Sequence, residues 1–212
     1  MEKYLQSSEI IDWQNPEILE LAHRLASPYQ TTAAIAKACF EWVRDEIHHS
    51  RDYQMNPVTC RASDVLKYKT GFCFAKSHLL AALLRANKIP AGLCYQRLTI
   101  DEPSESKLIS NSMPCTLHGL NAIFLPEIGW YRVDPRGNRD GVDAQFVPPR
   151  EQLAFEIKLP QETDFVGVLA EPLPVVVQVL EQCKTWEEVL VALPDISLES
   201  ALLTELTNPP IV

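Results

Sequence analysis

Residues 70–78 read Thr-Gly-Phe-Cys-Phe-Ala-Lys-Ser-His and lead into an Ala/Leu-rich apolar run at residues 79–86. A threonine able to cap, a glycine that frees the backbone and this apolar run predict a helix beginning at about Cys73. Aligned peptide dipoles place partial positive charge at the N-terminus of a helix. Because that charge stabilises the thiolate, which is the reactive form of cysteine, Cys73 is a candidate nucleophile.

Two later segments carry the groups that such a nucleophile needs. Residues 117–125, LHGLNAIFL, and residues 129–135, GWYRVDP, have the composition of two strands joined by a short turn. The first strand carries His118 and the second carries Asp134. A thiol, an imidazole and a carboxylate in this order suggest a Cys-His-Asp site for acyl transfer.

The pairing register of this hairpin decides whether His118 and Asp134 can meet. A two-residue loop at 127–128 would send the two side chains to opposite faces of the sheet, because side chains alternate along a strand. A three-residue loop at 126–128 would leave them on one face as diagonal neighbours, with α-carbons about 7–8 Å apart. A triad therefore requires an odd loop or a bulge, and the sequence does not decide between the two registers.

Taken singly, each of the three residues has a simpler structural explanation. Free cysteine is among the most buried residue types, so Cys73 could be a core residue of its helix. His118 could equally lie in the core, and Asp134, which precedes a proline, could cap the end of a strand. Only the combination of the three supports a catalytic interpretation.

Composition excludes several other classes of function. The chain has 212 residues, of which 46% are hydrophobic and 22% charged, as is typical of a soluble globular protein. With a net charge of −9 and no basic stripe, the chain is not expected to bind nucleic acid. No apolar run approaches about 18 residues and the N-terminus has no signal-peptide pattern, so we expect a cytoplasmic protein without a membrane partner.

The cysteines are expected to be thiols and not disulfides in that compartment. They lie at positions 39, 60, 73, 94, 115 and 183. No paired Cys/His spacing and no glycine-rich phosphate loop occurs, so the sequence predicts neither a metal nor a cofactor. It leaves the oligomeric state open.

Helix and strand signals elsewhere complete an α+β chain. Asn15-Pro16 predicts a helix to about residue 26, and an amphipathic helix follows from residue 31 or 32 to about residue 47. His48 and His49 are interpreted as residues that the dipole favours at the end of that helix. Further elements are expected as follows: a loop at 49–61, a helix at 62–67 capped by Ser63, strands at 91–100 and 153–159, a polar loop at 101–114, irregular chain at 138–149, and helices from about 175, 185 and 197.

The segments 62–66 (ASDVL), 71–75 (GFCFA) and 88–92 (KIPAG) resemble the nucleophile region of the transglutaminase-like superfamily. The strands that carry His118 and Asp134 resemble its histidine and aspartate strands, and the similarity covers about residues 35–138. The chain is most similar to the bacterial members that are grouped with cysteine proteases. It departs from them at Leu120, where an aromatic residue is frequent, and at Lys88, where glycine is usual.

The resemblance implies a papain-like α+β core, with the nucleophile helix packed on an antiparallel sheet and extra helices at both ends. It implies that Cys73 is the nucleophile, that His118 is the general base and acid, and that Asp134 orients His118. Gln54 is a candidate second oxyanion donor, because its amide N–H could join the backbone N–H of Cys73. We expect one domain over residues 1–212, with a catalytic core at 31–160 and a helical extension at 161–212.

The expected reaction is acyl transfer through a thioester, without a cofactor. Hydrolysis of a peptide, protein or small amide is favoured, because water is always available and no sequence feature marks a site for an amine. Two alternatives remain open. One is a protein-glutamine transglutaminase, in which an amine accepts the acyl group, and the other is a non-catalytic module that binds a peptide in the same cleft.

Overall fold

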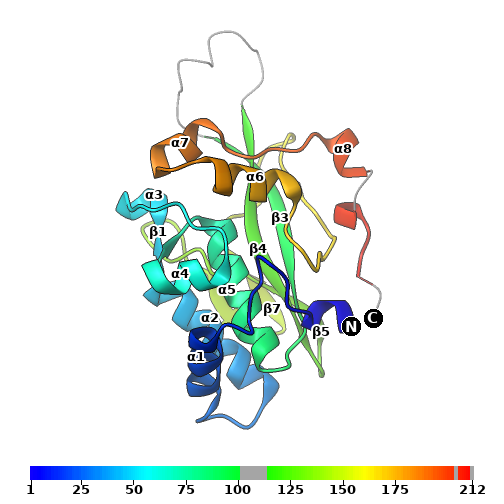
Figure 1. The fold of residues 1–212 in the computed structure, drawn as a ribbon. Coiled ribbons are helices and arrows are strands. Elements are labelled where there is room, and N and C mark those ends of the chain that lie inside the picture. Colours follow the sequence, from blue (N-terminus) through cyan, green and yellow to red (C-terminus); the bar gives the residue numbers. More distant parts are fainter. Residues whose placement is uncertain (101–113, 203–204, 211–212) are drawn as a thin grey trace.

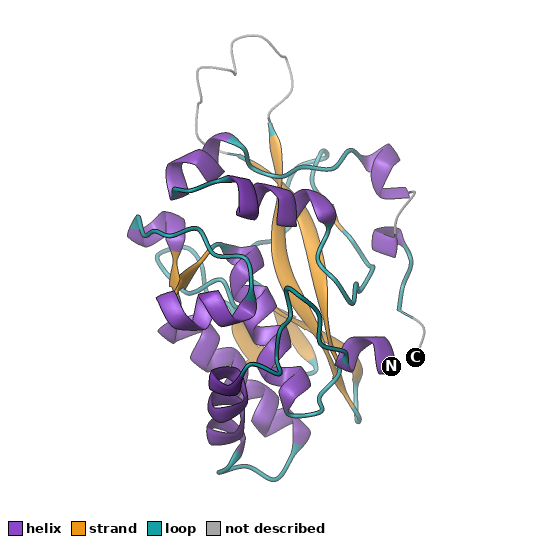
Figure 2. Ribbon diagram, in the orientation of Figure 1, coloured by secondary structure: helices purple, strands orange, loops and turns teal. Residues whose placement is uncertain are grey.

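The computed structural model of the protein describes residues 1–100, 114–202 and 205–210, and its central element is helix α5 (Cys73–Ala86) (Figure 1). Every residue from Cys73 to Arg85 is buried, because the helix is enclosed by other helices on one side and by a sheet on the other. Figure 2 shows these helices gathered on one face of the sheet. They are α1 (Pro16–Ala26), α2 (Thr32–Glu46) and α4 (Ala62–Tyr68).

The sheet is antiparallel, with the strand order β5-β4-β3-β8. Its strands are β3 (Ala91–Thr99), β4 (Cys115–Leu125), β5 (Gly129–Val133) and β8 (Thr163–Asp164). The pairing of β4 with β3 runs from Cys115 to Ile123, whereas β5 reaches only to Asn121 of β4. The edge of β4 that precedes Asn121 therefore has no partner in β5. This arrangement confirms the predicted α+β class.

The hairpin between β4 and β5 has the register that a triad requires. Leu125 lies opposite Gly129, so the loop consists of the three residues 126–128. Because Ala122 pairs with Arg132, the even-numbered residues of the two strands share one face, and this face includes His118 and Asp134.

Two short strands occupy places where the sequence predicted other structure. Strand β1 (His48–His49) pairs in parallel with β2 (Thr70–Gly71), and α3 (Ser50–Tyr53) follows it. The histidines therefore lie in a strand and not at the end of α2, and residues 50–53 of the expected loop are helical. The Thr70 hydroxyl bonds to the His48 carbonyl at 3.3 Å and caps nothing in α5, whose N-cap is Phe72.

The chain after β5 also differs from the prediction. Strands β6 (Gln145–Val147) and β7 (Arg150–Gln152) form a hairpin within and just after the segment expected to be irregular. The prediction of a strand at 153–159 is wrong. Backbone groups of this segment form hydrogen bonds with side chains and not with a neighbouring strand. The Asp134 carboxylate accepts from the Ala154 N–H, and the Phe155 carbonyl accepts from the Gln96 amide.

Helix caps were predicted with mixed success. Asn15, Thr31 and Thr185 each accept a backbone N–H at the start of a helix, close to where the sequence predicted these helices to begin. Ser63 lies inside α4 and does not cap it. Lys88, where the family usually has glycine, has a φ of 60°, a left-handed conformation that glycine adopts more readily. The predicted loop at 101–114 lies, except for its last residue, outside the described residues.

The C-terminal region packs against the same hydrophobic core as α5. Val176, Val189 and Leu206 belong to that core. The two ends of the chain lie side by side, joined by an ion pair between Lys3 and Glu205 (Figure 1). The remaining short helices are η1 (Glu2–Leu5), α6 (Pro174–Gln182), α7 (Trp186–Val191), α8 (Leu198–Leu202) and η3 (Glu205–Thr207).

Candidate active site

Helix α5 begins at the part of the β4 edge that β5 leaves unpaired, and this places Cys73 beside Gly119. The Gly119 N–H donates to the Cys73 Sγ at 3.5 Å. A Cβ at position 119 would lie 2.8 Å from Phe74 Cδ1 and 3.0 Å from Phe74 Cα, so only glycine permits this approach. Sequence reasoning missed Gly119, although its position directly after His118 in the strand was a usable signal.

His118 and Asp134 form a buried pair, with His118 Nε2 2.7 Å from Asp134 Oδ2. Asp134 is fully buried and also accepts the backbone N–H groups of Arg136 and Ala154, each at 3.1 Å. Burial tends to raise the pKa of Asp134, but the charge of His118 and these hydrogen bonds lower it below its ordinary value. The carboxylate is therefore ionised and held in one orientation.

The imidazole of His118 is held in its protonated form. Burial tends to lower the pKa of His118, but the charges of Asp134 and Cys73 and the hydrogen bonds to both raise it to about 10. Since Asp134 takes Nε2, Nδ1 is the nitrogen left for Cys73. The ring is also fixed by an edge-to-face contact with Phe155, whose centroid lies 5.0 Å away. The structure thus brings the three predicted residues together.

His49 is a further buried group at this site. It pairs with Gly71 across β1 and β2, two residues before Cys73, and its ring meets that of Phe72 edge to face at 5.6 Å. Its Nδ1 has no hydrogen-bond partner among the described residues. Burial, together with the positive charges of Arg136 and Lys76, holds the pKa of His49 well below its ordinary value. The imidazole is therefore neutral and carries a single N–H.

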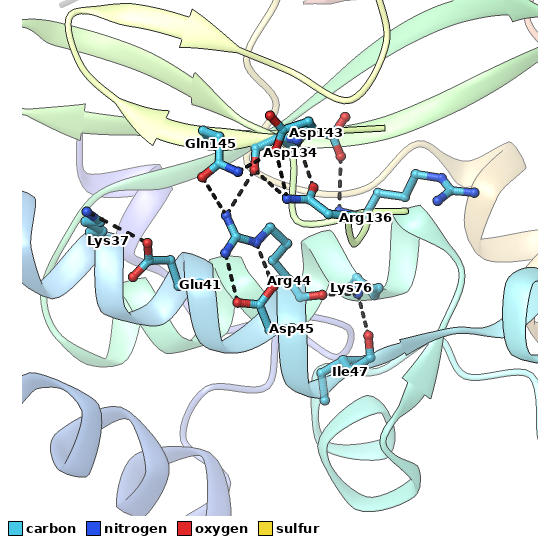
Figure 3. A network of polar contacts seen from close by, with 12 residues as sticks. Lys37, Glu41, Arg44, Asp45, Ile47, Lys76, Asp134, Arg136, Asp143 and Gln145 are labelled. Carbon is cyan, nitrogen blue, oxygen red and sulfur yellow. Dashed lines mark hydrogen bonds and ion pairs between the residues drawn. The ribbon is translucent and has the colours of Figure 1, made fainter. Parts of the chain in front are cut away.

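Polar contacts of Lys76 and Arg136 join the elements around the site, and Figure 3 shows those of Lys76. The Lys76 ammonium, on α5, donates to the carbonyls of Arg44 and Ile47, which lie at the end of α2 directly before β1. Arg136 makes two bonds to the Asp52 carboxylate, at 2.8 and 3.0 Å, and so joins α3 to the end of β5. These contacts fix the position of β1 relative to the start of α5.

The candidate oxyanion donor Gln54 lies outside the site. It is exposed at the C-terminal end of α3, with a left-handed φ of 52°. It does not line the cavity beside Cys73. The polar loop pattern around residue 54 did not predict this, because the short helix α3 turns Gln54 away from the nucleophile.

A cavity of about 1320 Å³ opens over Cys73 and His118. His49, Gln96 and Phe155 also line it. None of the six cysteines forms a disulfide bond. In the described ranges, no group of three or more His, Cys, Asp or Glu side chains could hold a metal ion, and no helix is long and apolar enough to cross a membrane.

The sequence pattern of the transglutaminase-like superfamily matches residues 19–135, more than half of the chain and all three residues of the site. The chain belongs to the transglutaminase-like superfamily. The match ends one residue after Asp134, so the region from β6 to the C-terminus lies outside the matched residues.

Solved structures with a similar fold include a proposed cysteine protease from Cytophaga hutchinsonii, with 18% identity and a TM-score of 0.48 over 63% of this chain and 40% of that chain. The periplasmic domain of TgpA from Pseudomonas aeruginosa has 24% identity and a TM-score of 0.44 over 62% of this chain and 45% of that domain. This transglutaminase-like chain thus matches less than half the length of each. A search of curated proteins finds no match.

Proposed function

We propose that this protein is a cysteine-dependent amide hydrolase in which Cys73, His118 and Asp134 form a catalytic triad. The observation that carries the proposal is the buried pair of His118 and Asp134, 2.7 Å apart, beside Cys73, whose charge helps to raise the pKa of His118. A buried imidazolium beside a thiol at a helix N-terminus suits nucleophilic attack by sulfur, because the pair supplies both a thiolate and a proton for the leaving group.

In the first step, the Cys73 thiolate attacks the carbonyl carbon of the amide, and the electron pair of the carbonyl moves onto its oxygen. As this oxyanion collapses, the bond from carbon to nitrogen breaks and the proton on His118 passes to the departing amine. A thioester and a neutral His118 remain. In the second step, His118 takes a proton from water, the hydroxide displaces the thiolate, and the acid leaves.

The oxyanion needs hydrogen-bond donors near the start of α5. The N-cap Phe72 provides no side-chain hydrogen bond, which leaves the first N–H groups of the helix to face an anion. We assign His49 as the second donor, in place of Gln54, because it is neutral, buried and lines the same cavity. A neutral imidazole has one N–H to offer and adds no charge that would compete for the thiolate.

Replacement of His49 by phenylalanine should lower kcat for an amide substrate by about 10²-fold, the usual effect of losing one oxyanion donor. Alkylation of Cys73 by iodoacetamide should keep its rate, because that displacement forms no oxyanion. Gln54→Ala is the matched control, and both of its rates should equal those of the wild type. Equal losses of turnover and alkylation in His49→Phe would instead indicate a disturbed site.

Product analysis tests the proposed reaction. The protein is incubated with glutamine-containing peptides and peptide amides, with and without a primary amine, and the products are identified by mass spectrometry. We expect products whose masses correspond to the addition of water across the amide, even when the amine is present. Amine-linked products would instead identify a transglutaminase. Rapid labelling of Cys73 without turnover of any amide would favour the peptide-binding alternative.

A further inference from the structure

One edge of β4 is covered by three different parts of the chain in succession. Strand β5 covers it as far as Asn121, and the next N–H on that side, from Gly119, points to the Cys73 Sγ. The following one, from Leu117, donates to the Pro194 carbonyl at 2.8 Å. N–H groups two residues apart point to the same side of a strand, so Pro194 lies on the Cys73 edge, immediately beyond the nucleophile.

Pro194 belongs to a C-terminal strap, defined here as residues 186–195, which is anchored at both ends. At its start, the Trp186 N–H donates to the Asn56 side chain at 2.8 Å. At its end, Asp195 receives two bonds from the Arg97 guanidinium, at 2.8 and 2.7 Å. Val189, in the middle, is fully buried. The strap is therefore a fixed part of the fold.

The strap also lines the cavity at the active site. Leu190 and Leu193 of the strap line it, together with Leu98 and Leu117 of the sheet. Thr116, which donates to the Pro194 carbonyl at 3.1 Å, lines it as well. The loop and hairpin after β5 contribute charged side chains to the lining, among them Arg139, Asp143 and Arg150.

We propose that the strap limits the substrate to one or two residues, or a short acyl or amine group, on one side of the scissile amide. A longer chain on that side would need the edge position that Pro194 occupies, and to take it would have to break the Leu117 hydrogen bond and the bonds between Arg97 and Asp195. The leucines that line the cavity beside the strap favour an apolar substrate group at that place. The inference rests on the proposed function and names its substrate class: a terminal residue or short apolar group joined to a longer chain.

Electrophilic epoxysuccinyl peptides test this limit without requiring turnover. The probes form a set in which either end of the epoxide carries one residue or about four residues. Four extended residues span roughly 13 Å. The rate constant for labelling of Cys73 is measured for each probe by mass spectrometry. In the wild type, lengthening one end should slow labelling by about tenfold or more, whereas lengthening the other should change it less than about threefold.

Variants of the strap test whether it causes the limit on substrate length. Leu193→Ala enlarges the cavity beside the strap, and Asp195→Asn weakens the anchor on Arg97. Each should reduce the difference in labelling rate between short and long probes by about threefold. Val191→Ala is the matched control, because its side chain belongs to the same strap but is 90% exposed. It should retain the full difference.

Three results would overturn the inference, and the third can be told apart from the first two. Equal labelling by short and long probes at both ends, or a length difference that Leu193→Ala and Asp195→Asn leave intact, would show that the strap sets no limit while the proposed function stands. Labelling of Cys73 by iodoacetamide no faster than that of the partly exposed Cys183 would remove the proposed function, and the substrate limit with it.

Discussion

Replacement of Cys73 by serine should abolish amide turnover and leave the fold intact. In the proposed mechanism the Cys73 thiolate attacks the carbonyl, whereas a serine hydroxyl beside His118 stays protonated and reacts far more slowly. We expect a loss of at least about 10⁴-fold in kcat/KM, because removing the nucleophile of a triad removes nearly all of its contribution. The rates are measured on the amide that the wild type turns over fastest.

The free energy of unfolding of Cys73→Ser distinguishes a catalytic role of Cys73 from a structural one. Cys73 is buried, but serine is of similar size and can accept the Gly119 N–H, so the free energy of unfolding should change by less than about 1 kcal/mol. Cys183→Ser is the control, since this partly exposed thiol lies outside the cavity and should retain full turnover. A Cys73→Ser protein that fails to fold would identify Cys73 as a core residue.

Replacement of His118 by glutamine should lower kcat/KM by about 10³-fold, because glutamine cannot deliver a proton to the leaving amine. Glutamine is preferred to alanine here because it keeps a donor for the Asp134 carboxylate. Without one, that fully buried charge would lose its partner, at a cost of about 3–5 kcal/mol. Turnover and urea unfolding are measured together on the variant.

The pH dependence of stability gives an independent check on His118. Its pKa is about 10 in the folded protein, against an ordinary value of 6.5, so folding favours the protonated form. The stabilisation is complete below about pH 6.5 and is lost as the pH rises through about 10. Because an unfolded thiol keeps its own proton up to about pH 8.5, the unfolding free energy of the wild type should fall more steeply than that of His118→Gln between about pH 8.5 and 10. Parallel curves would show that His118 is not held as an imidazolium.

The nucleophile helix and the hairpin could be predicted because their signals are local. The Ala/Leu-rich run after Cys73 and the alternating strands around His118 and Asp134 each depend on neighbouring residues. The hairpin register could not be decided, because Pro126-Glu127-Ile128 has no Asn-Gly or Asp-Gly pair to fix a two-residue turn. In the structure the loop has three residues, 126–128, and this places His118 and Asp134 on one face of the sheet.

Features that depend on distant partners were missed. The pairing of His49 with Gly71 involves strands of two residues, too short for a period to be visible, so His49 was interpreted as a helix-end residue. Thr70 was taken for a cap because its hydroxyl has no visible competitor in the sequence, yet it bonds to the His48 carbonyl. The contact between Pro194 and Leu117 joins residues far apart in the chain, and no local pattern predicts it.

The most direct test of the triad is the rate of Cys73 alkylation by iodoacetamide across pH, in the wild type and in His118→Gln. If His118 holds the proton that leaves the thiol, alkylation in the wild type should remain fast down to about pH 6. In His118→Gln the rate should fall by about tenfold for each unit below pH 8.5, as for an ordinary thiol. The same profile in both proteins would contradict the pairing of Cys73 with His118, and with it the proposed catalytic site.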